Sequence, residues 1–143
     1  MTPIRREWMI GENIVYFEPP DLLRVKYRGV CSLQEATQMV ETCRELGTRR
    51  PVFILGDMEE AGALDAEARH YFGEHFRPEW IQGLIYYKTR LLHKAVLVGL
   101  RLAIEMARVE STPLLWKIHF VSTQEKAEAL LTQLRAQPND GSR

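Results

Sequence analysis

The sequence has little that would tie it to a membrane or to nucleic acid. Lys plus Arg and Asp plus Glu both number 19, whereas a general nucleic-acid binder carries excess cations that displace phosphate counterions. The longest apolar region, residues 91–107, is interrupted by charged side chains, so we expect no membrane insertion. Residues 1–8 contain arginines without an apolar stretch behind them, so we expect no signal peptide.

Cysteine and catalytic motifs are scarce too. The two cysteines, Cys31 and Cys43, lack C-x-x-C spacing, and we expect thiols in a reducing, cytoplasmic environment. The sequence has no G-x-G-x-x-G, P-loop or H-E-x-x-H motif, and neither His93 nor His119 has a predictable Ser or Cys partner. We therefore predict a protein that is not an enzyme, with no catalytic residues, no cofactor and no metal.

Periodicity predicts strands first and alternating helices afterwards. Residues 23–28 alternate apolar and basic side chains, which is typical of a half-buried strand. Ser32 and Glu35 fit a capping box before a helix that ends near Gly47. The predicted strands are residues 7–10, 13–18, 23–28, 51–56, 84–87 and 117–121, and the helices begin near residues 32, 65, 89 and 122. Residues 57–64 are predicted as a loop.

This order predicts an α/β fold, β-β-β-α-β-α-β-α-β-α. Strands that alternate with single helices imply crossover connections, so the sheet should be mixed, with an antiparallel start and four helices. The length of 143 residues fits a single domain. We place that domain at residues 1–136 and expect a flexible, polar tail at 137–143.

The order of elements resembles the STAS domain, the fold of the anti-sigma-factor antagonists, over roughly residues 7–134. The most specific stretch is VFILGDMEEAGALDAEARHYF, where an apolar strand ends at Asp57 and Asp65 follows eight residues later. In STAS antagonists a phosphorylatable serine then opens the next helix, and that position falls on Ala66. The resemblance therefore implies a divergent, SpoIIAA-like bacterial protein that keeps the fold without the phosphorylation switch.

The resemblance also implies a partner surface on the acidic stretch, where the antagonists present their regulated surface. Its residues are Asp57, Glu59, Glu60, Asp65 and Ala66. We thus predict a non-catalytic, STAS-like protein-interaction and regulatory module whose partner is unknown. A homodimer stays open.

A second predicted site comprises Lys88, Thr89 and Arg90. Open α/β sheets bind ligands at the C-terminal ends of their parallel strands, so this basic loop and the acidic stretch are expected to converge there. Cationic side chains before a helix suit an anion. The alternative function is a small-molecule or lipid-binding domain that uses this crevice.

Three further features have weaker functional interpretations. The basic side chains of the third strand would face either an acidic partner or solvent, where edge cations discourage strand pairing; they are Arg24, Lys26 and Arg28. Residues 67, 70 and 74 have metal-like spacing, but a solvated helix face explains them better. The three tryptophans, Trp8, Trp80 and Trp116, are expected in the core, although exposed tryptophans anchor interfaces.

Overall fold

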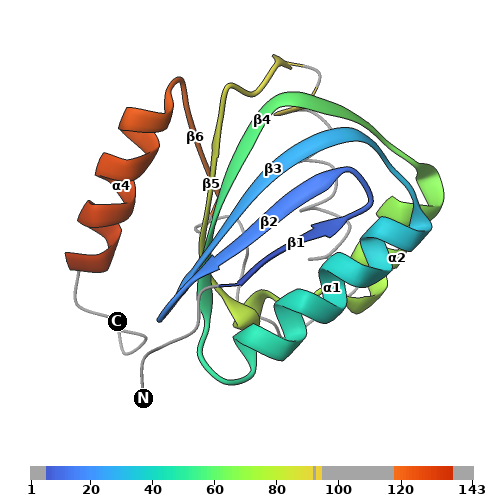
Figure 1. Ribbon diagram of the computed structural model, residues 1–143, viewed down its shortest axis with the longest axis horizontal. Coiled ribbons are helices and arrows are strands. Elements are labelled where there is room, and N and C mark those ends of the chain that lie inside the picture. Colours follow the sequence, from blue (N-terminus) through green and yellow to red (C-terminus); the bar gives the residue numbers. More distant parts are fainter. Residues whose placement is uncertain (1–5, 92, 95–117, 137–143) are drawn as a thin grey trace.

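The computed structural model describes residues 6–91, 93–94 and 118–136. These residues form an α/β fold with a six-stranded mixed sheet, whose strands lie side by side in sequence order from β1 to β6 (Figure 1). The predicted class, antiparallel start and parallel continuation are confirmed. The described part contains three α-helices. The helix predicted from residue 89 lies largely outside it, as do Trp116 and the predicted tail.

The antiparallel start is a three-stranded meander. It comprises β1 (Arg6–Ile10), β2 (Asn13–Glu18) and β3 (Leu22–Cys31). Gly11 has a φ of 62°, which suits the first central position of a two-residue hairpin turn. The buried Asn13 side chain donates to the Ile10 carbonyl and accepts the Arg28 N–H, both at 2.8 Å. One side chain therefore ties β1, β2 and β3 together.

Helices and parallel strands alternate in the remainder. The elements are α1 (Leu33–Gly47), β4 (Val52–Leu64), α2 (Ala66–His75), a 3-10 turn (Pro78–Trp80), β5 (Ile81–Tyr87), β6 (Ile118–Val121) and α4 (Gln124–Ala136). The predicted capping box opens α1, where Glu35 accepts the Ser32 N–H at 2.8 Å. At α4, Thr123 Oγ1 accepts the Lys126 N–H at 3.1 Å. Both helix starts follow from cap residues that satisfy free amides.

The sheet has a hydrophobic core on each face. Helices α1 and α2 cover one face, and α4 covers the other (Figure 1). The smaller core packs Leu22, Phe53, Leu55, Ile85 and Tyr87 against Ala127 and Leu131 of α4. The larger core, on the α1 side, includes Leu23, Val25, Val40, Ile54 and Trp80. Because the central strands are covered on both sides, residues 51–56 are almost uniformly apolar.

The alternation predicted for β3 is confirmed. Leu23 and Val25 are buried on the α1 side, and the basic side chains lie on the opposite face. However, β3 lies inside the sheet, between β2 and β4. The interpretation of its cations as edge-strand protection is therefore wrong.

Strand β4 departs most from the prediction. It continues to Leu64, so the loop predicted at residues 57–64 is wrong. Beyond Asp57 this extension pairs with β3 alone among the described residues, because β5 ends opposite Asp57 at Tyr87. Gly29 has a φ of 72°, and a Cβ at Gly62 would lie 2.7 Å from the Gly29 carbonyl. Asp, Glu and Gly disfavour strands, but pairing with β3 overrides that propensity.

Candidate functional site

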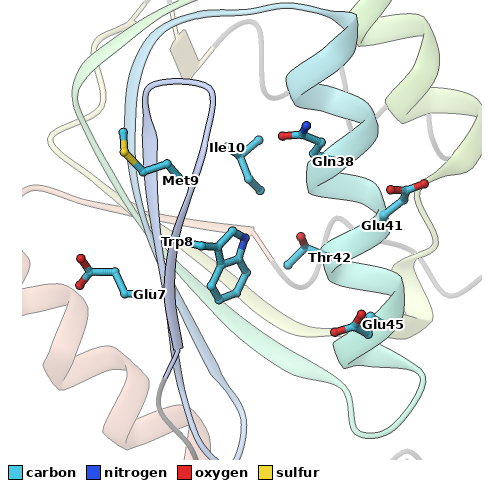
Figure 2. Close-up of a pocket in the computed structure, with 8 residues that line it drawn as sticks. All are labelled: Glu7, Trp8, Met9, Ile10, Gln38, Glu41, Thr42 and Glu45. Carbon is cyan, nitrogen blue, oxygen red and sulfur yellow. The ribbon is translucent and has the colours of Figure 1, made fainter.

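A groove lies between the edge strand β1 and helix α1. Its volume is about 730 Å³, within the range of pockets that hold ligands or bound side chains. Figure 2 shows the residues that line it, and all of them come from these two elements. They are Glu7, Trp8, Met9 and Ile10 of β1, and Gln38, Glu41, Thr42 and Glu45 of α1.

The alternation of β1 decides which of its side chains face the groove. Trp8 and Ile10 point towards α1, whereas Glu7 and Met9 project from the other side of the strand (Figure 2). Ile10 is buried in the larger core, and the half-buried Trp8 packs against that core. Met9 is 59% exposed. The floor of the groove is therefore apolar and partly aromatic.

Helix α1 supplies a polar wall. Its lining residues occupy positions i, i+3, i+4 and i+7, which form one stripe along a helix. The neighbouring stripe contains Met39, Cys43 and Leu46, which are buried against the sheet. The helix thus turns its apolar face to the core and presents carboxylates beside the groove.

Strand β1 also offers an open backbone edge. Among the described residues it pairs with β2 only. The register places Ile10 opposite Asn13 across the two-residue turn and Trp8 opposite Val15. In such a hairpin the closing pair exchanges two hydrogen bonds, and from there hydrogen-bonded pairs alternate with pairs that are not hydrogen-bonded. Ile10 and Trp8 therefore belong to hydrogen-bonded pairs, whereas Met9 and Glu7 do not. The backbone N–H and C=O groups of Glu7 and Met9 therefore point outwards, away from β2.

Carboxylates are among the described side chains that line the groove. They belong to Glu7, Glu41 and Glu45. Arg44, on the same helix, approaches Glu41 at 4.0 Å, where both side chains are 58% exposed. An exposed pair at this distance contributes little net interaction.

The predicted acidic partner surface lies on the β4 extension and the start of α2. Glu60 contacts Lys26 Nζ and Arg28 Nε, both at 3.3 Å, and hydrogen bonding and attraction to Lys26 hold its pKa below the usual value. Asp57 accepts the Glu59 N–H at 3.0 Å. Asp65 is the N-cap of α2, and Ala66 is its first helical residue. Within this surface, the charge of Glu60 is thus matched by two cations of β3.

The second predicted site adjoins the first, as expected from the parallel strands. Lys88 Nζ lies 3.3 Å from Glu59 Oε1, and Arg90 donates to the Glu59 carbonyl at 3.5 Å. Lys88 has a φ of 57°, in the left-handed region. Thr89 Oγ1 and His93 Nδ1 are buried polar atoms with no hydrogen-bond partner in the described part of the chain. Residues 88–90 and the β4 extension therefore converge at one end of the sheet.

The remaining basic side chain of β3 fastens α4 to the sheet. Arg24 donates to both carboxylate oxygens of Glu128, at 2.5 and 3.1 Å, and to Glu18 at 3.3 Å. This pairing holds the pKa of Glu128 below its usual value, chiefly through the Arg24 hydrogen bond. Arg135 of α4 likewise contacts Asp21, which is buried. The basic side chains of β3 therefore all contact carboxylates of the same chain.

The titratable groups do not form a reactive pair within the described ranges. Burial raises the pKa of Cys31 to about 11 and that of Cys43 to about 12, so both thiols stay protonated at neutral pH and are weak nucleophiles. Burial lowers the pKa of His119. His70 contacts Glu74 at 3.2 Å, and residues 6–91, 93–94 and 118–136 contain no cluster of three metal-ligating side chains.

Sequence reasoning missed the groove. Trp8 was expected in the core but is half-buried and lines the groove, whereas Trp80 is buried as expected. The available signal was the polar stripe at residues 38, 41, 42 and 45. It became informative only when the fold placed that stripe beside β1.

Within the described residues, no helix combines the length and the apolar character needed to cross a membrane. No family model matches the sequence, and no curated protein matches it.

Proposed function

We propose that the protein is a non-catalytic interaction module that binds an extended segment of a partner protein along the outer edge of β1. One observation carries this proposal: the outer edge of β1, which pairs with no other strand in the described part of the chain, borders a groove whose other wall is α1. A segment added beside an edge strand forms main-chain hydrogen bonds and inserts alternate side chains into adjacent pockets. The groove supplies both elements of that recognition mode.

Two contributions would provide the affinity. The outward backbone groups of Glu7 and Met9 supply main-chain hydrogen bonds, each worth about 0.5–1.5 kcal/mol net. Side chains inserted into the groove would cover Trp8 and Ile10, and buried apolar area contributes about 25 cal/mol per Å². Tryptophan is also enriched among the residues that dominate interface energies.

A proline substitution tests this geometry. Met9→Pro removes the outward N–H of residue 9, and proline is tolerated on an edge strand where that N–H faces solvent. Met9→Ala is the matched control because it shortens the side chain and keeps the N–H. Circular dichroism would verify that both variants fold.

The binding partners for this test are peptides selected from a displayed random library against the full chain. We expect Met9→Ala to retain their binding and Met9→Pro to weaken it by about tenfold or more, because a hydrogen bond and the strand alignment are lost. Equal binding by the two variants would contradict the proposal. A library that yields no specific peptide would also count against it.

We also propose that the chain is a cytoplasmic, STAS-like domain of the SpoIIAA-like group. The antiparallel start, the sequential strand order and the crossover helices support this assignment. Helix α2 begins at Ala66, directly after Asp65, so the position of the family's switch serine has no hydroxyl. Regulation through phosphate at that helix start would therefore require another residue.

A small-molecule or lipid site around Lys88, Thr89 and Arg90 is the second candidate. Its support is a pair of buried atoms, Thr89 Oγ1 and His93 Nδ1, that have no hydrogen-bond partner among the described residues, because such groups are normally hydrogen-bonded. Native mass spectrometry of freshly purified protein tests it. Extra mass that is lost on denaturation would support a bound ligand, and a clean mass would count against it.

A further inference from the structure

We infer that α4 occupies a helix-docking face on the sheet and leaves this face while the rest of the domain stays folded. The side chains that form the helix-docking face are Leu22, Phe53, Leu55, Ile85 and Tyr87, which share the smaller core with α4. The face lies on the side of the sheet opposite α1 and α2 (Figure 1). It is therefore distinct from the β1–α1 groove, and its occupant can be tested separately from strand addition.

Helix α4 buries fewer side chains than α1. Of its 13 residues, Ala127 and Leu131 are buried, whereas six of the 15 residues of α1 are buried. Leu130 and Leu134 are half-buried against the sheet. Helices in proteins are stabilised mainly by packing of their apolar face, and elements with few buried apolar contacts open locally at low free energy. We therefore expect α4 to open more readily than α1.

Ion pairs in the second and last turns of α4 fix its position on the sheet. Glu128 pairs with Arg24 of β3, and Arg135 pairs with Asp21, which directly precedes β3. The Arg135 guanidinium also lies 6.0 Å from the centroid of the Phe53 ring. Both partners of the Arg24–Glu128 pair are partly exposed, and such pairs contribute orientation more than affinity. The charges therefore align α4 without making its release costly.

Release of α4 exposes a continuous apolar surface. Leu22 lies opposite Phe53 in the pairing of β3 with β4, and Leu55 lies opposite Ile85 in the pairing of β4 with β5. While α4 is docked, Leu22 and Ile85 are 0% exposed. A contiguous apolar surface that faces water is typical of an interaction site. Helix α4 therefore blocks this site in the closed state.

The contacts of α4 define which partner fits the helix-docking face. Ala127, Leu131 and Leu134 occupy positions i, i+4 and i+7, which form one stripe along the helix. Glu128 and Arg135 are seven positions apart and lie together on one side of that stripe. The partner is therefore an amphipathic helix that combines this apolar spacing with an acidic residue and, seven positions later, a basic one.

Amide hydrogen exchange of the full chain tests the release of α4. After correction for intrinsic rates, the central amides of α4, residues 128–134, should exchange at least about tenfold faster than those of residues 52–55, because local opening needs less free energy than global unfolding. Glu128→Gln should accelerate exchange of the α4 amides about fivefold, since Arg24 loses a charged hydrogen-bond partner. Unchanged exchange in this variant would contradict release controlled by the ion pair.

Ile54→Val is the matched control because it weakens the domain away from α4. Ile54 is buried in the larger core, on the α1 side of the sheet. The substitution should accelerate exchange at residues 52–55 about threefold or more and leave the α4 amides unchanged, because the rest of the domain stays folded while α4 is open. Equal acceleration of both regions would show that α4 leaves only on global unfolding, which would overturn the inference.

A fluorescein-labelled peptide with the sequence of residues 122–136, STQEKAEALLTQLRA, tests the helix-docking face by fluorescence anisotropy. Leu131→Ala in the full chain should raise the affinity for this peptide by about tenfold or more, because a larger fraction of molecules has α4 released. Glu128→Gln, a milder change, should raise it about fivefold. Circular dichroism would verify that both variants fold.

A second peptide tests the charge pattern of the partner helix. STQEKAKALLTQLRA carries lysine in place of the glutamate that pairs with Arg24, and it should bind Leu131→Ala more weakly than the first peptide because like charges meet. Equal affinity of the wild-type chain and both variants for the first peptide would overturn the helix-docking face. Equal binding of the two peptides would overturn the charge pattern assigned to the partner.

Discussion

Two acidic surfaces lie beside open stretches of strand, but they differ in what they offer to an occupant. On the β4 extension, Glu60 contacts Lys26 and Arg28, and Glu59 contacts Lys88, all at 3.3 Å. The described lining of the β1–α1 groove also contains carboxylates, but its floor is apolar and partly aromatic, and it borders a strand that pairs on one side only among the described residues. The charges of the first surface are therefore paired with neighbouring elements of the same chain, whereas the second offers apolar surface and backbone groups to an occupant.

The comparison shows that acidic residues in the sequence do not by themselves mark a docking surface. Whether their charge is available depends on which strand the fold places beside them. Strand β3 brings its cations to β4 through parallel pairing, with Lys26 opposite Asp57 and Arg28 opposite Glu60. No basic strand lies beside β1 among the described residues.

Removing a carboxylate that pairs with a neighbouring element should lower the stability of the fold and leave peptide binding at the groove unchanged. Glu128→Gln should lower the free energy of unfolding by about 1 kcal/mol at neutral pH, because Arg24 loses a charged partner of two hydrogen bonds. Urea unfolding would measure this change. Glu79→Gln, at an exposed position of the 3-10 turn, is the matched control and should change stability less.

The same pair should also give a pH dependence of known sign. The pKa of Glu128 is lowered in the folded state, so its contribution to stability is fully present above the unfolded pKa. That contribution is lost as the pH falls through the folded pKa. The difference in stability between wild type and Glu128→Gln should therefore disappear in acid. A difference that is constant with pH would show that the side chain acts through packing alone.

The smallest effect is expected on the β4 extension. Glu59→Ala/Glu60→Ala/Asp65→Ala should leave the binding of a library-selected peptide within about twofold of wild type, because exposed pairs contribute little and this surface lies outside the groove. Anisotropy with the same peptide is the measurement. A large loss would return the partner surface to the acidic stretch first predicted from the sequence.

Local chemistry made much of the fold predictable from sequence. Ser32 and Glu35 marked the start of α1, and the apolar and basic alternation of β3 gave its two faces correctly. The extension of β4 was not predictable, because its acidic and glycine residues are typical of a loop. They form a strand only because β3 provides backbone hydrogen-bond partners and cations beside them. The groove was not predictable from the sequence either, because it forms only where the fold places β1 beside α1.

Amide hydrogen exchange tests the central claim most directly. On addition of a library-selected peptide, the amides of Glu7 and Met9 should exchange at least about tenfold more slowly, because their outward N–H groups become hydrogen-bonded. The amides of Trp8 and Ile10, already directed at β2, should change less. New protection at residues 57–64 or 88–90 with none at Glu7 and Met9 would contradict strand addition at β1.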